Sequence, residues 1–195
     1  MLQYKKFKIM EKGMKTEFEA RLLEVDTEKF ITKLKENNAE FIGEWNQIRK
    51  CYDINPSDKS TWIRLRKEAD KSTLTIKEIK SKKIDGTKEC EIEVSDFSTT
   101  DEILNKLGYF ARTTQENKRT RYILNGVEID IDSWPLIPTY VEFEGKNEED
   151  IFNVCKSLDI NPENLTTIDV VEIYEHYGIK DMSSIPNLTF ETTLK

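Results

Sequence analysis

The chain has 195 residues, of which 34% are charged and 37% hydrophobic, and its formal net charge is −7. This length suits one domain, or one domain with an extension. The acidic balance argues against a nucleic-acid-binding protein, and no stretch approaches the roughly 18 apolar residues of a membrane-spanning helix.

Residues 1–14 are basic and lack the apolar core of about 7–15 residues that a signal peptide requires. We interpret them as an N-terminal tail or extension. No low-complexity segment, repeat or Gly/Pro-rich linker follows, so residues 15–178 are expected to form a single domain. Residues 179–195 are expected to be a loosely structured C-terminal tail.

The three cysteines are widely spaced and lack the spacing of a metal finger: Cys51, Cys90 and Cys155. Reduced thiols are therefore expected, which indicates a cytoplasmic protein. Because Cys90 alternates with glutamates, it should face outward beneath a helix as a small hydrophobic residue.

The first half of the chain combines strand patterns with one helix. Alternating residues predict a first strand over 15–24, and a helix over 27–37 follows with Asp26 or Thr27 as its cap. Four further strands are predicted after this helix, over 39–53, 61–68, 73–79 and 88–94.

The second half begins with a helix that Ser98 or Thr99 caps and Gly108 ends. A strand is predicted over 109–115. The strongest hairpin signal then joins 118–124 to 127–132 through Asn125-Gly126, which suits a type I′ turn. The last elements are a strand over 139–144, a helix opened by Asn147 and a final helix over 166–177.

Eight or nine mostly antiparallel strands with three or four helices predict an α+β fold. An open sheet of this size exposes edges, and closure into a barrel removes them. The apolar strand faces would then point outward beneath the helices, and the ionic faces would line the lumen.

Charged residues alternate with apolar residues along most of these strands, which gives each strand one ionic face. The acidic faces carry Glu17 and Glu19, Glu91 and Glu93, Glu128, Asp130 and Asp132, and Glu142 and Glu144. The basic faces carry Arg64 and Arg66, Lys77, and Arg119 and Arg121, with Arg21 as a further candidate. Such a lumen is tolerable only if its charges face one another, water, metal ions or a polyanion.

The residue types indicate a metal and a phosphate ligand. Carboxylates two residues apart on a strand lie about 6.5–7 Å from each other on one face, and converging pairs make an all-oxygen site for Mg²⁺ or Mn²⁺. Arginine forks match phosphate oxygens. An anion that needs both a metal and several arginines is most simply a polyphosphate.

The order of these motifs resembles the CYTH superfamily, the triphosphate tunnel metalloenzymes, named from class IV adenylyl cyclases and thiamine triphosphatases. The resemblance runs from about Lys15 to Tyr177. Its carriers are Glu17-Phe18-Glu19-Ala20-Arg21, Trp62-Ile63-Arg64-Leu65-Arg66, Thr75-Ile76-Lys77, Glu91-Ile92-Glu93 with Glu89 as an alternative register, Arg119-Thr120-Arg121, and the acidic strands within Val127–Gly145.

The resemblance implies an eight-stranded antiparallel tunnel that binds a triphosphate with a divalent metal. It implies catalytic roles for Glu17, Glu19, Arg21, Glu91 and Glu93, triphosphate binding by Arg64, Arg66, Lys77, Arg119 and Arg121, and metal binding by Glu17, Glu19, Asp130, Asp132, Glu142 and Glu144. The family signature ends in lysine where this chain has Arg21. Arginine stays protonated, so a proton-transfer role at this position is in doubt and an anion-binding role survives.

Two other residues favour structural interpretations. His176 is the only histidine, and its predicted place at a helix C-terminus suits a cation. A histidine base or a histidine-rich metal site is thereby excluded. Trp134 opens a rigid crossing segment, Trp134–Pro138, whose role is more simply structural than adenine stacking.

The leading expectation is a metal-dependent enzyme that hydrolyses the triphosphate of a nucleotide, thiamine triphosphate or inorganic tripolyphosphate. The alternative is a class IV adenylyl cyclase that makes cyclic AMP and pyrophosphate. A further alternative is a non-catalytic polyphosphate- or nucleotide-binding module, which the change to Arg21 motivates. Mg²⁺ or Mn²⁺ is the expected cofactor, and a monomer or homodimer without nucleic-acid or membrane partners is the expected assembly.

Overall fold

The computed structural model describes residues 13–193, so the expected N-terminal extension lies outside the described residues except for its last two. The strands are β1 Lys15–Leu22, β2 Glu40–Asn55, β3 Asp58–Glu68, β4 Lys71–Ile79, β5 Thr87–Val94, β6 Ala111–Leu124, β7 Val127–Ser133, β8 Tyr140–Gly145 and β9 Asn187–Leu188. The α-helices are α1 Thr27–Glu36, α2 Phe97–Lys106, α3 Glu148–Ser157 and α4 Val170–His176. Two short 3-10 helices are η1 Pro162–Asn164 and η2 Met182–Ser184.

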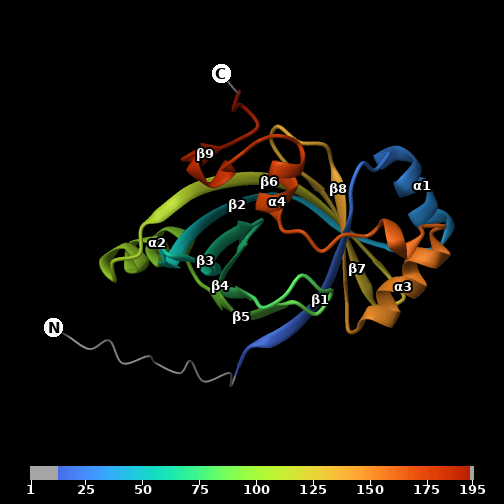
Figure 1. The fold of residues 1–195 in the computed structure, drawn as a ribbon, viewed down its shortest axis with the longest axis horizontal. Coiled ribbons are helices and arrows are strands. Elements are labelled where there is room, and N and C mark those ends of the chain that lie inside the picture. Colours follow the sequence, from blue (N-terminus) through green and yellow to red (C-terminus); the bar gives the residue numbers. More distant parts are fainter. Residues whose placement is uncertain (1–12, 194–195) are drawn as a thin grey trace.

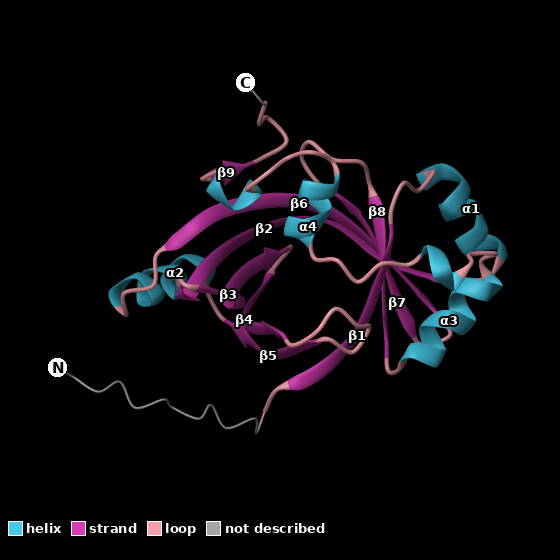
Figure 2. Cartoon of the chain, in the orientation of Figure 1, coloured by secondary structure: helices cyan, strands magenta, loops and turns pink. Residues whose placement is uncertain are grey.

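The first eight strands form a closed antiparallel barrel (Figures 1 and 2). Their order around the barrel is β2-β3-β4-β5-β1-β8-β7-β6, and the pairing of β6 with β2 closes it. The short β9 joins β6 in parallel. The predicted eight-stranded barrel with helices outside is therefore confirmed.

Strict alternation sorts the side chains of β7 between the two faces of the barrel wall. Val127, Ile129 and Ile131 are buried in the outer hydrophobic core. Asp130 and Asp132 lie on the other face, towards arginines of β6. One strand thus supplies both a helix-packing surface and an ionic lumen surface.

Helices α1 and α3 cover β1, β7 and β8 from outside (Figure 1). Phe30 and Leu34 of α1 pack with Ile151 and Val154 of α3 against the sheet, and the ring of Phe30 meets that of Phe143 edge-on at 6.3 Å. On the opposite side of the barrel α2 packs through Leu104. No helix of the described residues has the length and apolarity needed to span a bilayer.

Helix α4 lies over one end of the barrel (Figure 1). The preceding segment is bound to β1 by two backbone hydrogen bonds of 2.8 Å between Arg21 and Thr166. Asp169 caps α4 and forms a capping box with Glu172. The Tyr174 hydroxyl donates to the carbonyl of Pro135 at 2.6 Å, which ties the helix to the β7–β8 crossing.

Part of the C-terminal segment, for which a loosely structured tail was expected, packs against the barrel. Met182 and Leu188 are almost fully buried, and they pack with Trp134 and Ile173 in the cluster beneath α4. Residues 182–188 pack against the barrel because burial removes these apolar side chains from water and because β9 extends the sheet at β6.

Smaller differences concern element boundaries. The strands predicted over 109–115 and 118–124 are one strand, β6, and Asp96, rather than Ser98 or Thr99, caps α2. Helix α4 starts at Val170 rather than Thr166. The Asn125-Gly126 turn is confirmed, because both residues have positive φ. Cys90 alternates with Glu89 and Glu91 as predicted, but it is exposed and not buried beneath a helix.

Candidate active site

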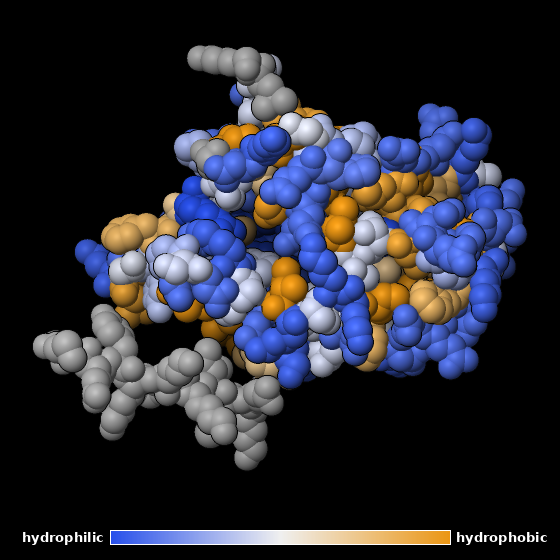
Figure 3. Space-filling view, viewed as in Figure 1, coloured by the Kyte–Doolittle hydropathy of each residue, from blue (hydrophilic) through white to orange (hydrophobic). Residues whose placement is uncertain are grey.

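The barrel encloses a cavity of about 560 Å³ that is lined mainly by charged side chains. Its charged lining from the barrel strands includes Glu17, Glu19, Arg21, Arg49, Arg64, Arg66, Lys77, Glu89, Glu91, Arg119, Arg121, Glu128, Asp132, Glu142 and Glu144. Figure 3 shows that the face carrying α4 is largely hydrophilic. The fold thus collects charges from all eight barrel strands around one space.

The lining divides into an acidic half and a basic half. The consecutive strands β5, β1, β8 and β7 supply the carboxylates, and the consecutive strands β6, β2, β3 and β4 supply most of the cations. Arg21 on β1 is the exception within the acidic half. A ligand in this cavity therefore meets cations on one side and carboxylates on the other.

The basic half on β3 and β4 makes few close ion pairs. Arg64 lies 3.2 Å from Glu91 and 3.7 Å from Glu89, and Arg66 lies 3.6 Å from Glu91. Lys77 contacts Glu17 at 2.8 Å. The longer arginine contacts leave N–H groups that an anion in the cavity can use.

The arginines of β6 are bound more firmly to carboxylates of β7. Arg119 donates to both oxygens of Asp132 at 2.8 and 2.5 Å and lies 2.6 Å from Asp130. Arg121 forms a similar fork with Asp130, with both distances 2.7 Å. These bidentate pairs align the arginines and neutralise much of their charge.

For two acidic side chains of the lumen, nearby cations do not offset the cost of burying the charged form. Burial, with Glu19 and Glu89 nearby, raises the pKa of Glu17 to about 8 despite Lys77. Burial, with Glu142 and Glu128 nearby, raises the pKa of Glu144 to about 7. The side chain of Glu144 makes no hydrogen bond or ion pair with any described residue. At neutral pH Glu17 is therefore mostly protonated and Glu144 about half protonated, and an approaching cation would favour the charged form of both.

Arg21 joins the other lumen acids. Its guanidinium lies 3.0 Å from Glu19 and 2.6 Å from Glu142, and it donates to the Ile168 carbonyl at 3.0 Å. Burial would raise the pKa of Glu142, but Arg21 and Arg119 hold it far below the ordinary value. Burial lowers and the two glutamates raise the pKa of Arg21, and the net effect is an increase. Arg21 therefore stays protonated.

The acidic half fits a divalent metal by its chemistry. Its donors are carboxylate oxygens, and the pKa values of Glu17 and Glu144 are raised mainly by burial and further by the neighbouring carboxylates, so a bound cation would stabilise their charged forms. Over residues 13–193, no three acidic, histidine or cysteine side chains converge as a ready-made metal cluster. Mg²⁺ is commonly held by one or two carboxylates together with substrate phosphates, so a ready-made cluster is not required.

Unpartnered donors also gather at this cavity. Within the described chain, the buried side-chain nitrogens without an acceptor are Nε of Arg21, Arg49, Arg64 and Arg112 and Nε1 of Trp134. All five residues line the cavity. Buried donors are normally satisfied, so their concentration here indicates a ligand rich in acceptor oxygens.

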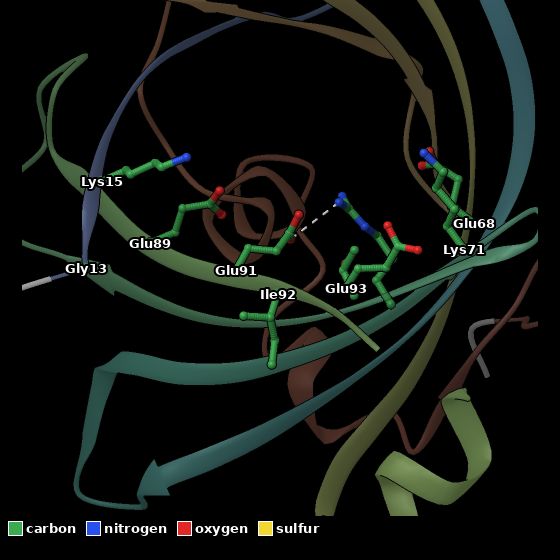
Figure 4. Close-up of a pocket in the computed structure, with 10 residues that line it drawn as sticks. Gly13, Lys15, Glu68, Lys71, Glu89, Glu91, Ile92 and Glu93 are labelled. Carbon is green, nitrogen blue, oxygen red and sulfur yellow. Dashed lines mark ion pairs between the residues drawn. The ribbon is translucent and has the colours of Figure 1, made fainter. Parts of the chain in front are cut away.

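The structure brings most predicted site residues together, with two exceptions. Asp130 is buried between Arg119 and Arg121 and does not line the cavity. Glu93 is exposed and lines an adjoining cavity of about 410 Å³ that shares Arg66, Glu89 and Glu91 with the main one (Figure 4). In Figure 4, Glu89 and Glu91 project to one side of β5 and Ile92 to the other. The acidic pair of β5 at the main cavity is thus Glu89 and Glu91.

Several lining residues were not predicted as site residues. Arg49 and Gln115 line the cavity from the barrel strands, Trp134 from directly after the end of β7, and Asp169 and Glu172 from the cap and first turn of α4. Alternation in β2 carried no clear signal, because Asn46 and Lys50 make its other face polar as well. The acids of α4 reach the cavity only through tertiary packing.

Comparisons with known proteins agree with this architecture. The family model described as "CYTH domain" matches residues 15–173. No curated protein sequence matches the chain significantly. Among solved structures, a conserved hypothetical protein of Pyrococcus furiosus is 26% identical with a TM-score of 0.70, and the match covers 81% of this chain and 99% of that one.

Two further structures carry functional descriptions of their own. A candidate adenylate cyclase from Vibrio parahaemolyticus is 14% identical with a TM-score of 0.69, over 83% of this chain and 98% of that one. A candidate adenylyl cyclase from Hippeastrum, reported with a dominant triphosphatase activity, is 14% identical with a TM-score of 0.55. That match covers 84% of this chain and 95% of the other. At such identities these two similarities establish the fold alone.

Proposed function

The chain belongs to the CYTH domain family, and from this premise we propose that it is a divalent-metal-dependent enzyme that hydrolyses a triphosphate. The division of the lumen into an acidic and a basic half carries the proposal. A triphosphate with bound metal has the matching pattern, because its oxygens seek cations and its metal seeks carboxylates. The unpartnered donors at the cavity support an oxygen-rich ligand.

The basic half would bind the phosphate chain. Arg64, Arg66 and Lys77 offer N–H donors and charge from β3 and β4. Arg119 and Arg121 add charge from β6 while Asp130 and Asp132 hold their side chains in place. Fixed cations of this kind position a phosphate chain and stabilise charge that develops on it.

The acidic half would hold Mg²⁺ or Mn²⁺ through Glu17, Glu19, Glu142 and Glu144, and Asp132, which is paired with Arg119, lines the same cavity. A bound divalent ion supplies charge neutralisation and orientation of the phosphates. Glu89 and Glu91 hold Arg64 and Arg66 in orientation towards the cavity. Arg21 keeps its proton, so it contributes charge to the site and cannot serve as an acid or base.

The apolar part of the lining favours an organic triphosphate as one class of substrate. Trp62 and Ile79 of the barrel and Val170, Val171 and Met182 near α4 line the same cavity. A nucleoside or another organic group has apolar surface to bury there. This lining keeps the class IV adenylyl cyclase reaction as the second candidate function, because cyclisation requires a bound nucleoside.

Product analysis tests the proposal. Purified protein is incubated with Mg²⁺ or Mn²⁺ and with ATP, thiamine triphosphate or inorganic tripolyphosphate, and all products are quantified. Hydrolysis is expected to release one phosphate per triphosphate. Equal amounts of cyclic AMP and pyrophosphate from ATP would instead identify the cyclase. Tight tripolyphosphate binding with no turnover would identify a non-catalytic binding module. The absence of both binding and turnover would refute the proposed triphosphate site.

A further inference from the structure

Arg49 is a lumen-facing cation on a strand for which the sequence indicated no charged site residue. It lies on β2, directly opposite Arg66 on β3 and Gln115 on β6. Its side chain is buried and lines the main cavity. With Arg49, each of the four consecutive strands of the basic half contributes a cation.

The partners of Arg49 are neutral. Nη2 donates to the amide oxygens of Gln47 at 2.7 Å and Asn117 at 2.6 Å, and the guanidinium carbon lies 4.5 Å from the ring centroid of Trp134. Its Nε has no acceptor. Arg49 forms no ion pair with any carboxylate of the described residues. Every other arginine of the chain does: Arg21, Arg64, Arg66, Arg112, Arg119 and Arg121.

The surroundings of Arg49 are unfavourable for a cation in the ligand-free protein. Burial, with Arg64 and Arg119 nearby, lowers the pKa of Arg49 to about 10. The same effects, with Arg49 among the neighbouring charges, lower the pKa of Arg66 to about 9. Both side chains are still protonated at neutral pH. A buried charge normally has a counterion; Asp132 offsets part of the unfavourable effect on Arg49 without forming an ion pair with it, and the cavity that Arg49 lines can hold an anion.

We propose that Arg49 is a substrate-binding residue that donates to the oxygens of the triphosphate, while Gln47, Asn117 and Trp134 hold its guanidinium in place. This inference rests on the proposed function and extends it to β2. The free Nε and the fork geometry suit an oxygen-rich anion. The like charges of Arg49 and Arg66, which repel each other in the ligand-free protein, become favourable once an anion lies between them.

The competing explanation is that Arg49 is a structural support for Trp134. The two roles give opposite effects on the ligand-free protein. If Arg49 supports Trp134, its replacement lowers the stability of the ligand-free fold. If Arg49 is an unpaired buried cation beside like charges, its replacement does not. Thermal melting and triphosphate binding, measured on the same variants, therefore separate them.

The test compares Arg49→Gln and Arg49→Lys with Lys50→Gln. Lys50 is the adjacent cation of β2, but it pairs with Asp101 outside the barrel. Calorimetry measures tripolyphosphate binding without divalent metal, so that no turnover occurs. Arg49→Gln is expected to weaken binding about 10- to 100-fold, as for a lost charge-assisted hydrogen bond. Its ligand-free melting temperature should be unchanged or higher. Lys50→Gln is expected to bind like the wild type.

Arg49→Lys keeps the charge and loses the fork, so an intermediate loss of affinity is expected. Binding by Arg49→Gln within twofold of the wild type would overturn the inference and leave the proposed function intact. A lower melting temperature with unchanged affinity would assign Arg49 to the structural role. If Arg49→Gln shows no cooperative melt, unchanged affinity in Arg49→Lys overturns the inference and reduced affinity supports it. A wild type that binds no tripolyphosphate, either without metal or with Mg²⁺ present, refutes both proposals.

Discussion

At the scale of single residues, Glu142 and Glu144 show how position decides the role of a carboxylate. They lie two residues apart on β8 and both line the cavity. Glu142 pairs with Arg21 and Arg119, whereas Glu144 has no partner of this kind and its pKa is raised to about 7. In the ligand-free protein Glu142 is thus a neutralised charge that a metal must share with two arginines, whereas Glu144 has no cation to give up.

This contrast predicts opposite effects for the same substitution. Glu142→Gln removes one member of a buried ion pair and should lower the free energy of unfolding by about 3 kcal/mol. Glu144→Gln should leave the ligand-free stability unchanged or slightly higher, because it relieves repulsion among carboxylates. It should also raise the metal concentration needed for half-maximal activity about tenfold. Urea denaturation and metal titrations measure the two quantities.

The pair serves as its own control, since both variants make the same chemical change on the same strand face. Equal destabilisation by the two substitutions would mean that Glu144 is a structural group. The metal assignment for Glu144 would then be abandoned.

At the scale of elements, Arg21 connects the lumen to α4. The strand β1 is bound to Thr166 through its backbone, and the Arg21 side chain reaches the Ile168 carbonyl while contacting Glu19 and Glu142. A planar guanidinium contacts these three acceptors through two different nitrogens. A lysine, which the family signature has here, presents all its donors from one nitrogen.

Arg21→Lys is therefore expected to retain the charge in the lumen and to loosen α4. Amide hydrogen exchange within residues 165–177 should become faster, and the free energy of unfolding should fall by about 1 kcal/mol from the lost hydrogen bond. Lys82→Ala is the control, because it removes the exposed ion pair between Lys82 and Glu172 of the same helix. Unchanged exchange in Arg21→Lys would show that the backbone bridge alone holds α4.

Sequence reasoning predicted the elements wherever period-two alternation was clean. The strands carrying Glu17, Arg64 and Asp130 have one apolar and one ionic face, and that pattern fixes which side of the barrel each residue faces. For β2 this pattern did not predict which face lines the lumen, because Arg49 and Lys50 make both of its faces polar. The register of β5 stayed open for a related reason. Glu89, Glu91 and Glu93 share a face, and only the barrel decides which of them reach the cavity.

The C-terminal residues could not be predicted in this way at all. Met182 and Leu188 are isolated apolar residues in a polar segment, and their burial depends on the surface that α4 and Trp134 provide. Ion pairing was equally hidden. From the sequence Asp132 was expected to be a metal ligand. The β6–β7 register, which the sequence does not show, places it opposite Arg119 as an ion-pair partner.

At the scale of the whole molecule, the lumen couples stability to pH. Glu17 and Glu144 have pKa values of about 8 and 7 in the fold, against about 4.3 for an ordinary glutamate. Between these limits the native state binds more protons than the unfolded state. Ligand-free stability should therefore fall as pH rises from about 5 to 8. Carboxylates with lowered pKa values, such as Glu142, stabilise the fold throughout this pH range, and their contribution is lost only at lower pH.

Thermal melts across this pH range test the coupling. The ligand-free melting temperature is expected to be highest near pH 5 and to fall by several degrees towards pH 8. Added Mg²⁺ or Mn²⁺ should raise it most at pH 8, because only the deprotonated carboxylates bind the metal. The double variant Glu17→Gln and Glu144→Gln is the control, and its profile should be flatter and its response to metal smaller. A wild-type melting temperature that rises from pH 5 to 8 would contradict the assignment of these two glutamates as crowded, uncompensated acids.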